Sequence, residues 1–157
     1  MIRAATLLTC ALGLAACSSI PLPIPIPFPG RGPGPAPIAD RPIELAGTCT
    51  QTEEDGFRED ARLVVRDNQV QALNWRLWVG KRGACSFDLT EFRQTKSHPT
   101  IELAARDGSG CRLFVYQDPR RVTLSHAGCQ RRCTGNIYEE AWPVMFDPQT
   151  GRCARTG

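Results

Sequence analysis

The chain has 157 residues, with 19 lysines and arginines against 16 aspartates and glutamates, so its formal net charge is only +3. This near balance, with basic residues scattered along the chain, argues against a nucleic-acid-binding protein. The length suits one domain and leaves little room for a second.

The N-terminal segment has the parts of a secretion signal. Arg3 supplies the positive charge, the apolar run 4–14 follows, and the small residues Ala15 and Ala16 suit a cleavage site. The run is too short for a permanent membrane-spanning helix. We therefore predict that residues 1–16 are a signal peptide, whose removal leaves 141 residues.

The segment Leu14-Ala15-Ala16-Cys17 resembles the lipobox of bacterial lipoproteins, in which the cysteine thiol is diacylated and becomes the new N-terminus. The resemblance implies fatty acids such as palmitate on Cys17, and two or three acyl chains together anchor a protein firmly. In that family an aspartate after the cysteine favours the inner membrane. The residue here is Ser18, which implies the periplasmic face of a Gram-negative outer membrane. The alternative is an ordinary signal peptide or an uncleaved anchor.

Residues 17–42 are predicted to form a stalk, because eight prolines occur in the 17 residues from 21 to 37. Proline has no backbone N–H and fits neither a helix nor a sheet. The first half is typical of a polyproline II rod, rising about 3.1 Å per residue, and the glycines of the second half make a softer hinge. A spacer is the simplest role, and a ligand for a proline-recognition domain or peptidoglycan is the alternative.

Six cysteines remain once Cys10 leaves with the signal peptide and Cys17 carries lipid. They are Cys49, Cys85, Cys111, Cys129, Cys133 and Cys153. An even number in an oxidising compartment predicts three disulfides, although six cysteines allow 15 pairings. Strand alternation places Cys85, Cys111 and Cys129 near one end of a sheet, so we expect Cys111 to pair with Cys85 or Cys129.

Residues 43–157 are predicted to form one all-β domain, because apolar residues there recur with period two between turn residues. Asp67-Asn68 predicts a tight hairpin turn into the clearest strand, 70–79, in which alternate residues are large and apolar. The whole pattern predicts a meander of seven strands. They cover residues 43–50, about 63–65, 70–79, 85–94, 101–105, 111–115 and 122–126. A sheet with one apolar side must curl or fold over, so a small barrel is the first expectation and a sandwich the second.

The segment 129–153 breaks the alternation, although it contains Trp142 and Phe146. We predict an irregular flap that is held by disulfides and contributes little to the core.

Metal binding and catalysis are not expected. His126, Cys129 and Cys133 are closely spaced, but structural zinc needs four ligands and an oxidising compartment favours disulfides. His126 shares the phase of the core-facing residues Val122 and Leu124, which predicts a buried or edge-of-core histidine. His98, in a polar turn, is expected to be exposed.

The acidic residues 53–55, 59–60 and 139–140 lie in stretches expected to be solvated loops, although paired carboxylates can hydrolyse glycosides. No Gly-x-Ser-x-Gly segment is present, and Cys-x-x-Cys-His, which binds haem c covalently, is absent. We predict a protein that is not an enzyme and has no cofactor.

A binding surface is the remaining candidate. Trp78 falls out of phase with the core face of its strand and is expected to point to solvent beside Lys81 and Arg82. An exposed tryptophan among basic residues is typical of an interface hot spot. The alternative is that Trp78 covers one end of the barrel or packs under the segment 129–153.

The sequence Trp78-Val-Gly-Lys81-Arg-Gly83 resembles the segment of periplasmic lysozyme inhibitors in which Trp or Tyr precedes Lys-Gly. Those inhibitors are small β-barrels that insert a loop with Ser and Lys into the lysozyme cleft, so the resemblance implies an inhibitory role for Lys81. The chain departs from the pattern, because Arg82 follows Lys81 and no matching Ser-Gly segment precedes it.

The sequence therefore predicts a membrane-tethered periplasmic lipoprotein whose β-domain binds a protein or cell-wall partner. A lysozyme-type inhibitor and a structural envelope component are the alternatives.

Overall fold

The computed structural model describes residues 40–154. The predicted signal peptide, Cys17 and nearly all of the stalk lie outside these residues. The described part contains nine β-strands and three single-turn 3-10 helices. None of its helices has the length and apolar character needed to cross a membrane.

The first sheet has four antiparallel strands in chain order, β1 (Leu45–Thr52), β2 (Phe57–Arg66), β3 (Gln69–Val79) and β4 (Gly83–Asp88). The predicted hairpin between β2 and β3 is confirmed. Its two turn residues, Asp67 and Asn68, have φ angles of 47° and 57°. Two successive positive φ values match the twist of the flanking strands, and aspartate and asparagine tolerate them.

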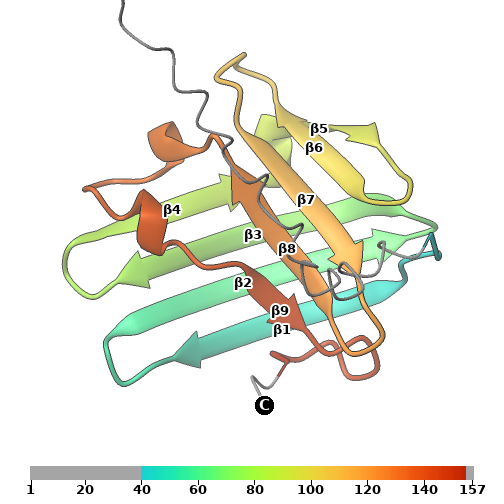
Figure 1. The fold of residues 1–157 in the computed structure, drawn as a ribbon, viewed down its shortest axis with the longest axis horizontal. Coiled ribbons are helices and arrows are strands. Elements are labelled where there is room, and N and C mark those ends of the chain that lie inside the picture. Colours follow the sequence, from blue (N-terminus) through green and yellow to red (C-terminus); the bar gives the residue numbers. More distant parts are fainter. Residues whose placement is uncertain (1–39, 155–157) are drawn as a thin grey trace, which may run out of the picture. The chain divides into compact units, whose positions relative to one another are not determined.

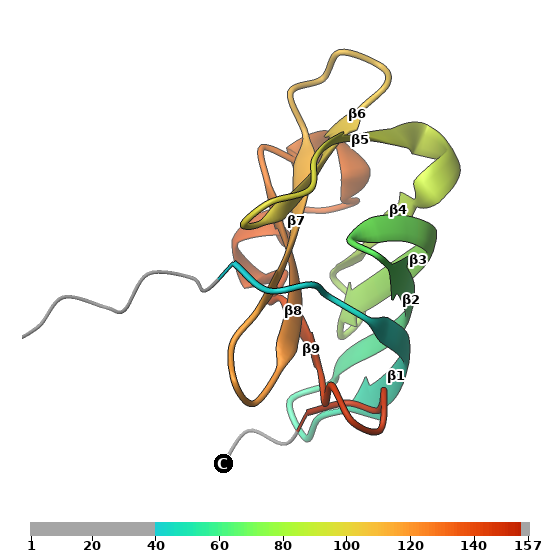
Figure 2. The ribbon, with the colours of Figure 1, turned by 90° about the vertical axis from the view of Figure 1, so that its right-hand side faces the viewer.

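The second sheet has five antiparallel strands, β5 (Phe92–Lys96), β6 (Ile101–Ala105), β7 (Arg112–Gln117), β8 (Val122–Ala127) and β9 (Val144–Phe146). Figure 2 shows the two sheets edge-on as separate layers, and in Figure 1 their strands cross obliquely. The all-β prediction is confirmed. The small barrel is not confirmed, because the described strands form two sheets, as in a sandwich, and no closed barrel is found among them.

The chain passes from one sheet to the other at a 3-10 turn, η1 (Leu89–Glu91). The prediction of one strand over 85–94 is therefore wrong. Asp88 accepts hydrogen bonds from the backbone N (3.0 Å) and the Oγ1 (2.6 Å) of Thr90. Such local bonds compete with strand pairing, so the first sheet ends here and the chain turns toward the second.

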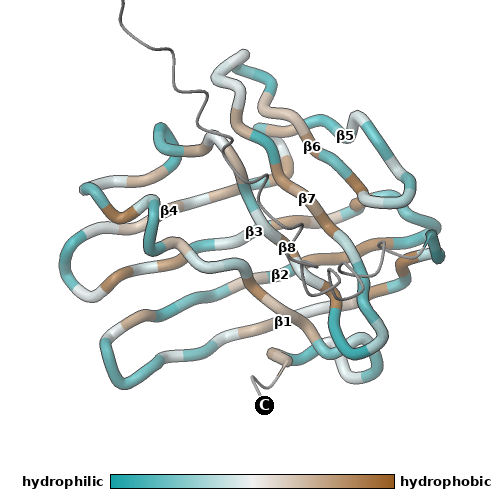
Figure 3. The backbone as a smooth tube through the Cα atoms, viewed as in Figure 1, coloured by the Kyte–Doolittle hydropathy of each residue, from teal (hydrophilic) through white to brown (hydrophobic). Residues whose placement is uncertain are grey.

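The core lies between the two sheets and consists of the inward-facing residues of both. Along the strands apolar and polar residues alternate, as the hydropathy colouring of Figure 3 shows. The largest fully buried side chains are Trp75, Phe87, Phe92, Phe146, Ile43, Leu63, Leu77, Ile101, Leu103, Leu113, Leu124 and Ile137. The predicted core face of 70–79 is thus confirmed.

The tail (residues 129–154) is more than a flap, and the prediction of a small core contribution is wrong. It contains η2 (Gln130–Arg132), η3 (Tyr138–Glu140) and β9, and it buries Ile137, Val144 and Phe146 completely. Phe146 lies so close to β1 that a Cβ on Gly47 would stand 2.7 Å from its ring. A three-residue strand is too short to show a period-two pattern, so the alternation did not reveal β9.

Three disulfides are present, as predicted, and each joins the tail to a different part of the domain. The pairs are Cys49–Cys153, Cys85–Cys133 and Cys111–Cys129. The expectation that Cys111 pairs with Cys85 or Cys129 is confirmed. Cross-links of this kind stabilise a fold mainly by restricting the unfolded chain.

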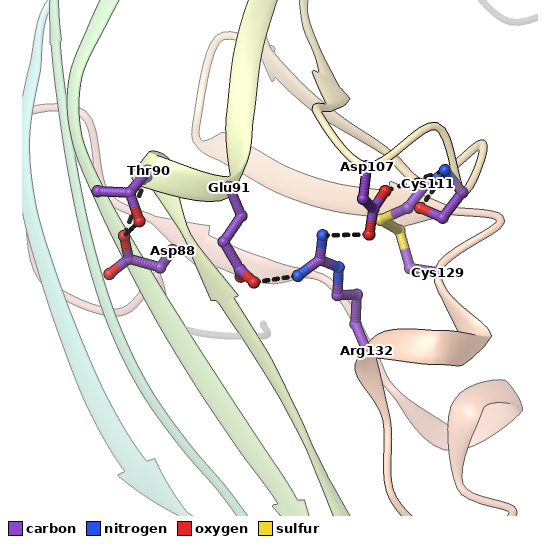
Figure 4. A network of polar contacts seen from close by, with 8 residues as sticks. Asp88, Thr90, Glu91, Asp107, Cys111, Cys129 and Arg132 are labelled. Carbon is purple, nitrogen blue, oxygen red and sulfur yellow. Dashed lines mark hydrogen bonds and ion pairs between the residues drawn. A yellow bond between two sulfur atoms is a disulfide. The ribbon is translucent and has the colours of Figure 1, made fainter.

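Arg132 of η2 forms a polar clamp at the corner between the sheets (Figure 4). Its guanidinium forms ion pairs with Glu91 of η1 and, at 2.9 Å, with Asp107 of the β6–β7 turn. The Arg132 side chain is only 12% exposed, and its guanidinium carbon lies 5.3 Å from the Phe92 ring. One side chain thus connects three turns that are far apart in the sequence.

Candidate binding cleft

Trp78 lies half-buried on the outer face of the first sheet. Arg58 stands directly opposite on β2, with its guanidinium carbon 4.0 Å from the centre of the Trp78 ring. A cation over an exposed tryptophan face is worth about 0.5–1 kcal/mol. Arg58 therefore covers part of the ring that the sequence predicts to be a free binding surface.

Lys81 and Arg82 are exposed in the β3–β4 turn, next to Trp78 in the chain. Arg82 forms a two-bond ion pair with Glu140 of η3, in which Nη1 donates to Oε1 at 2.6 Å. This partner holds the pKa of the Glu140 carboxyl below its usual range. Arg82 is thus turned toward the tail, whereas Lys81 has no ion-pair partner in the described part of the chain.

The β1–β2 loop lies beside the β3–β4 turn, where the backbone N of Gly80 donates to the backbone O of Gly56 at 3.1 Å. A cleft of about 550 Å³ opens between this β1–β2 region and the tail. We call it the Glu59 cleft. Its lining comprises Gln51, Glu53, Phe57 and Glu59 on one side and Trp142, Pro143, Met145, Cys153 and Ala154 on the other.

Glu59 forms the floor of the Glu59 cleft, and the expectation that it is a solvated loop residue is wrong. It lies on β2, faces the core and is only 1% exposed. Its Oε1 accepts a hydrogen bond from Nε2 of Gln51 at 2.7 Å, while the buried Oε2 has no donor at full hydrogen-bond distance and the Trp75 indole N–H, itself buried, is the donor nearest to the carboxyl.

Burial raises the pKa of the Glu59 carboxyl to about 7, because a charge is poorly solvated between the sheets. Hydrogen bonds from the Trp75 indole and from Gln51 lower the pKa of Glu59, and the nearby negative charge of Glu53 raises it. Each of these effects is smaller than the effect of burial. The sequence contained a signal for this burial. Glu59 has the phase of Phe57, Ala61 and Leu63, so the period-two pattern extended backward predicts an inward glutamate.

Trp142 lies at the mouth of the Glu59 cleft, between η3 and β9. Its side chain is 68% exposed, and among residues 40–154 no other large hydrophobic side chain is exposed. The sequence pattern places Trp142 in an irregular segment and indicates no role for it. Only the packing of the tail against β1 and β2 brings it beside Glu59.

His126 lies at the edge of the core, as predicted. Its ring packs against Phe87 and Tyr138, with centroids 5.3 and 5.1 Å away, and its Nε2 lies 3.0 Å from the backbone O of Ala141. Burial lowers the pKa of His126, which favours the neutral ring. His126 is therefore a packing residue in this fold.

Cys129 and Cys133 belong to separate disulfides, so neither offers a thiolate to a metal beside His126. Within residues 40–154 no group of three or more His, Cys, Asp or Glu side chains is arranged to hold a metal ion. His98 is exposed, as predicted, and its Nδ1 lies 2.9 Å from Oδ1 of Asp40.

The Glu59 cleft is the site at which a buried, incompletely bonded carboxyl meets an exposed aromatic ring. Comparison of the chain with protein-family models, with curated proteins and with solved structures gives no match.

Proposed function

We propose that this chain is a lipid-anchored outer-membrane protein whose β-domain binds a protein or cell-wall component at the Glu59 cleft. The observation that supports this most directly is Trp142, a large apolar side chain left 68% exposed at the mouth of a cleft. Tryptophan is the residue most enriched among binding hot spots, because it buries a large area with few rotatable bonds.

The walls of the Glu59 cleft are held in place before any partner arrives. Cys49–Cys153 joins β1 to the end of the tail, and Cys85–Cys133 joins β4 to its beginning. The Arg82–Glu140 ion pair adds a contact between the β3–β4 turn and η3. A preformed site loses less conformational entropy on binding, so these links favour recognition over a purely structural role.

The predicted lipid on Cys17 and the stalk 17–42 complete the proposal. They hold the domain near the membrane while leaving the cleft accessible to partners in the periplasm. The surface at this end of the domain also includes Trp78, Lys81 and Arg82, which we assign to the rim of the same interface.

The experiment is crosslinking of intact cells followed by purification of the protein from the membrane fraction. Wild-type protein is expected to retain a discrete partner, and Trp142→Ala is expected to retain at least tenfold less. Tyr116→Ala is the matched control, because Tyr116 is a partly exposed aromatic residue on the second sheet, outside the lining of the Glu59 cleft. Equal capture by both variants contradicts the proposal.

A lysozyme-type inhibitor stays a second prediction, favoured by the exposure of Lys81 at the tip of the β3–β4 turn. Inhibition of lysozyme by micromolar wild-type protein, and its loss in Lys81→Ala, is the expected result. A structural envelope component without a ligand remains the third prediction.

A further inference from the structure

The Cys49–Cys153 disulfide borders two adjoining hollows of the domain. Cys153 is partly exposed and lines both the Glu59 cleft and a second hollow of about 450 Å³, whereas Cys49 is only 1% exposed. Thiol–disulfide exchange begins when a thiolate attacks one of the two sulfurs, and access decides which one is attacked. Cys153 is therefore the cysteine open to attack, and Cys49 supplies the sulfur that leaves.

The second hollow attracts anions to the side of Cys153. Its ionisable lining residues are Asp147 and three arginines, Arg120, Arg121 and Arg152. Asp118 pairs with Arg121 at 3.4 Å from outside the lining, and positive charge is in excess even when this carboxylate is counted. The thiolate is the nucleophile of the exchange and is negatively charged, so the arginines favour its approach to Cys153.

The carboxyl of Glu59 stands on the buried side of the same disulfide. Its Oε1 lies 3.8 Å from Sγ of Cys49 and is held in place by the hydrogen bond from Gln51. Because the pKa of Glu59 is raised to about 7, a part of this carboxyl is protonated at neutral pH. A carboxylic acid beside a leaving sulfur has the position of a general acid, and this role needs no access from solvent.

We propose that Cys49–Cys153 is an exchangeable disulfide, opened by a dithiol reductant with Glu59 as the proton donor. A thiolate of the reductant attacks Sγ of Cys153, the bond to Cys49 breaks, and its electron pair goes to Sγ of Cys49. That sulfur takes the proton of the Glu59 carboxyl, and a mixed disulfide remains on Cys153. The second thiol of the reductant then releases Cys153, so two electrons pass to the protein and the dithiol becomes a disulfide.

The exchange removes the covalent link between β1 and the end of the tail. The fold is expected to persist, because two disulfides remain and the backbone N of Thr48 still donates to the backbone O of Gly151 at 2.8 Å. This inference goes beyond the proposed function, since the exchange requires no partner at Trp142. Capture of a partner without any effect of Glu59 on reduction would leave the binding function standing and the exchange wrong.

The chain contains its own matched disulfide for comparison. Cys85–Cys133 also joins a buried cysteine, Cys85 at 1% exposure, to a partly exposed one, Cys133. Cys133 lines neither of the two hollows, and a backbone carbonyl oxygen, that of Cys129, lies 3.9 Å from its Sγ. Cys85–Cys133 therefore shares the unequal exposure of its cysteines with Cys49–Cys153 but stands apart from Glu59 and the arginines.

The test is reduction of the full chain, purified in detergent, by dithiothreitol at pH 6 and pH 8. Free thiols are trapped by alkylation, and each disulfide is followed by mass spectrometry. The measured quantity is the reduction rate of Cys49–Cys153 divided by that of Cys85–Cys133. This ratio cancels the ionisation of the reductant and changes in global stability.

The ratio in the wild type is expected to exceed that in Glu59→Gln at least tenfold at pH 6. The excess is expected to fall about tenfold by pH 8, because the protonated fraction of a carboxyl with a pKa of about 7 falls from about nine-tenths to about one-tenth. Glu53, the three arginines and His126, whose ring packs against Trp75, also carry charge or titrate near the disulfide. They are common to both proteins, so the comparison isolates Glu59.

The matched control is Asp60→Asn, the same loss of a carboxyl at the next residue of β2, whose side chain is exposed on the outer face. It is expected to keep the wild-type ratio. With a monothiol, 2-mercaptoethanol, the mixed disulfide is expected on Cys153. Equal ratios in the wild type and Glu59→Gln at pH 6, a mixed disulfide on Cys49, or simultaneous loss of all three disulfides overturns the inference.

Discussion

At the scale of the residue, Glu59 stands out because its environment opposes its charge. The side chain sits in phase with apolar neighbours on β2 and is sealed from solvent, and its pKa is raised to about 7. A carboxyl of this kind destabilises the fold once it ionises.

We predict that Glu59 makes the fold less stable as the pH rises. Its folded pKa lies above the unfolded value of 4.5, so the folded state binds more protons between pH 4.5 and 7 and loses stability across that window. Glu59→Gln should therefore exceed the wild type in unfolding free energy by up to about 3 kcal/mol at pH 8, and by little at pH 4.5. Urea denaturation at both pH values measures this difference.

His126 makes the stability depend on pH in the opposite direction. Because its pKa is lowered in the folded state, the fold loses stability as the pH falls below 6.5. Comparing variant with wild type at each pH removes this contribution. Asp60→Asn should show no such pH-dependent gain. A constant difference between Glu59→Gln and the wild type from pH 4.5 to pH 8 would contradict the assignment.

At the scale of the element, the corner between the sheets depends on side chains from three turns. Asp88 stops β4, η1 redirects the chain, and Arg132 then fastens η1 and the β6–β7 turn to the tail. Each turn alone has few buried apolar groups. The clamp therefore makes up for the hydrophobic packing that a corner lacks.

We predict that Arg132→Met lowers the unfolding free energy by about 1–2 kcal/mol, because two ion pairs and a contact with Phe92 are lost while the freed carboxylates stay near solvent. Arg112→Met is the control, since its single pair with Glu102 is longer, at 3.4 Å, and its side chain is exposed. Arg112→Met should lower the unfolding free energy by about 0.5 kcal/mol or less. Equal losses in chemical denaturation would show that Arg132 is not a clamp.

At the scale of the whole molecule, the tail decides both the fold and the site. It supplies β9 and Phe146 to the core, one cysteine to each of the three disulfides, and Trp142 to the Glu59 cleft. The cleft exists only where the tail meets β1 and β2. A change that loosens the tail is therefore expected to affect stability and binding together.

The predicted tether is tested at the same scale. Replacing Cys17 with Ala removes the thiol that the lipobox resemblance assigns to acylation, so the variant should leave the membrane fraction and lack fatty acids. Cell fractionation and mass spectrometry of the purified protein measure both properties. Unchanged membrane partitioning and acyl content would rule out the lipid anchor at Cys17.

The sequence by itself determined which residues of the best strands face inward, the turn at Asp67 and Asn68, the all-β class and the two candidate partners of Cys111, of which the structure selects Cys129. These features follow from the period of two in an extended backbone and from local turn chemistry, which neighbouring residues specify. Tertiary structure alone decided the pairing of β9 with β8 and the position of Trp142 beside Glu59. Those features depend on contacts between residues far apart in the chain, and no local pattern carries that information.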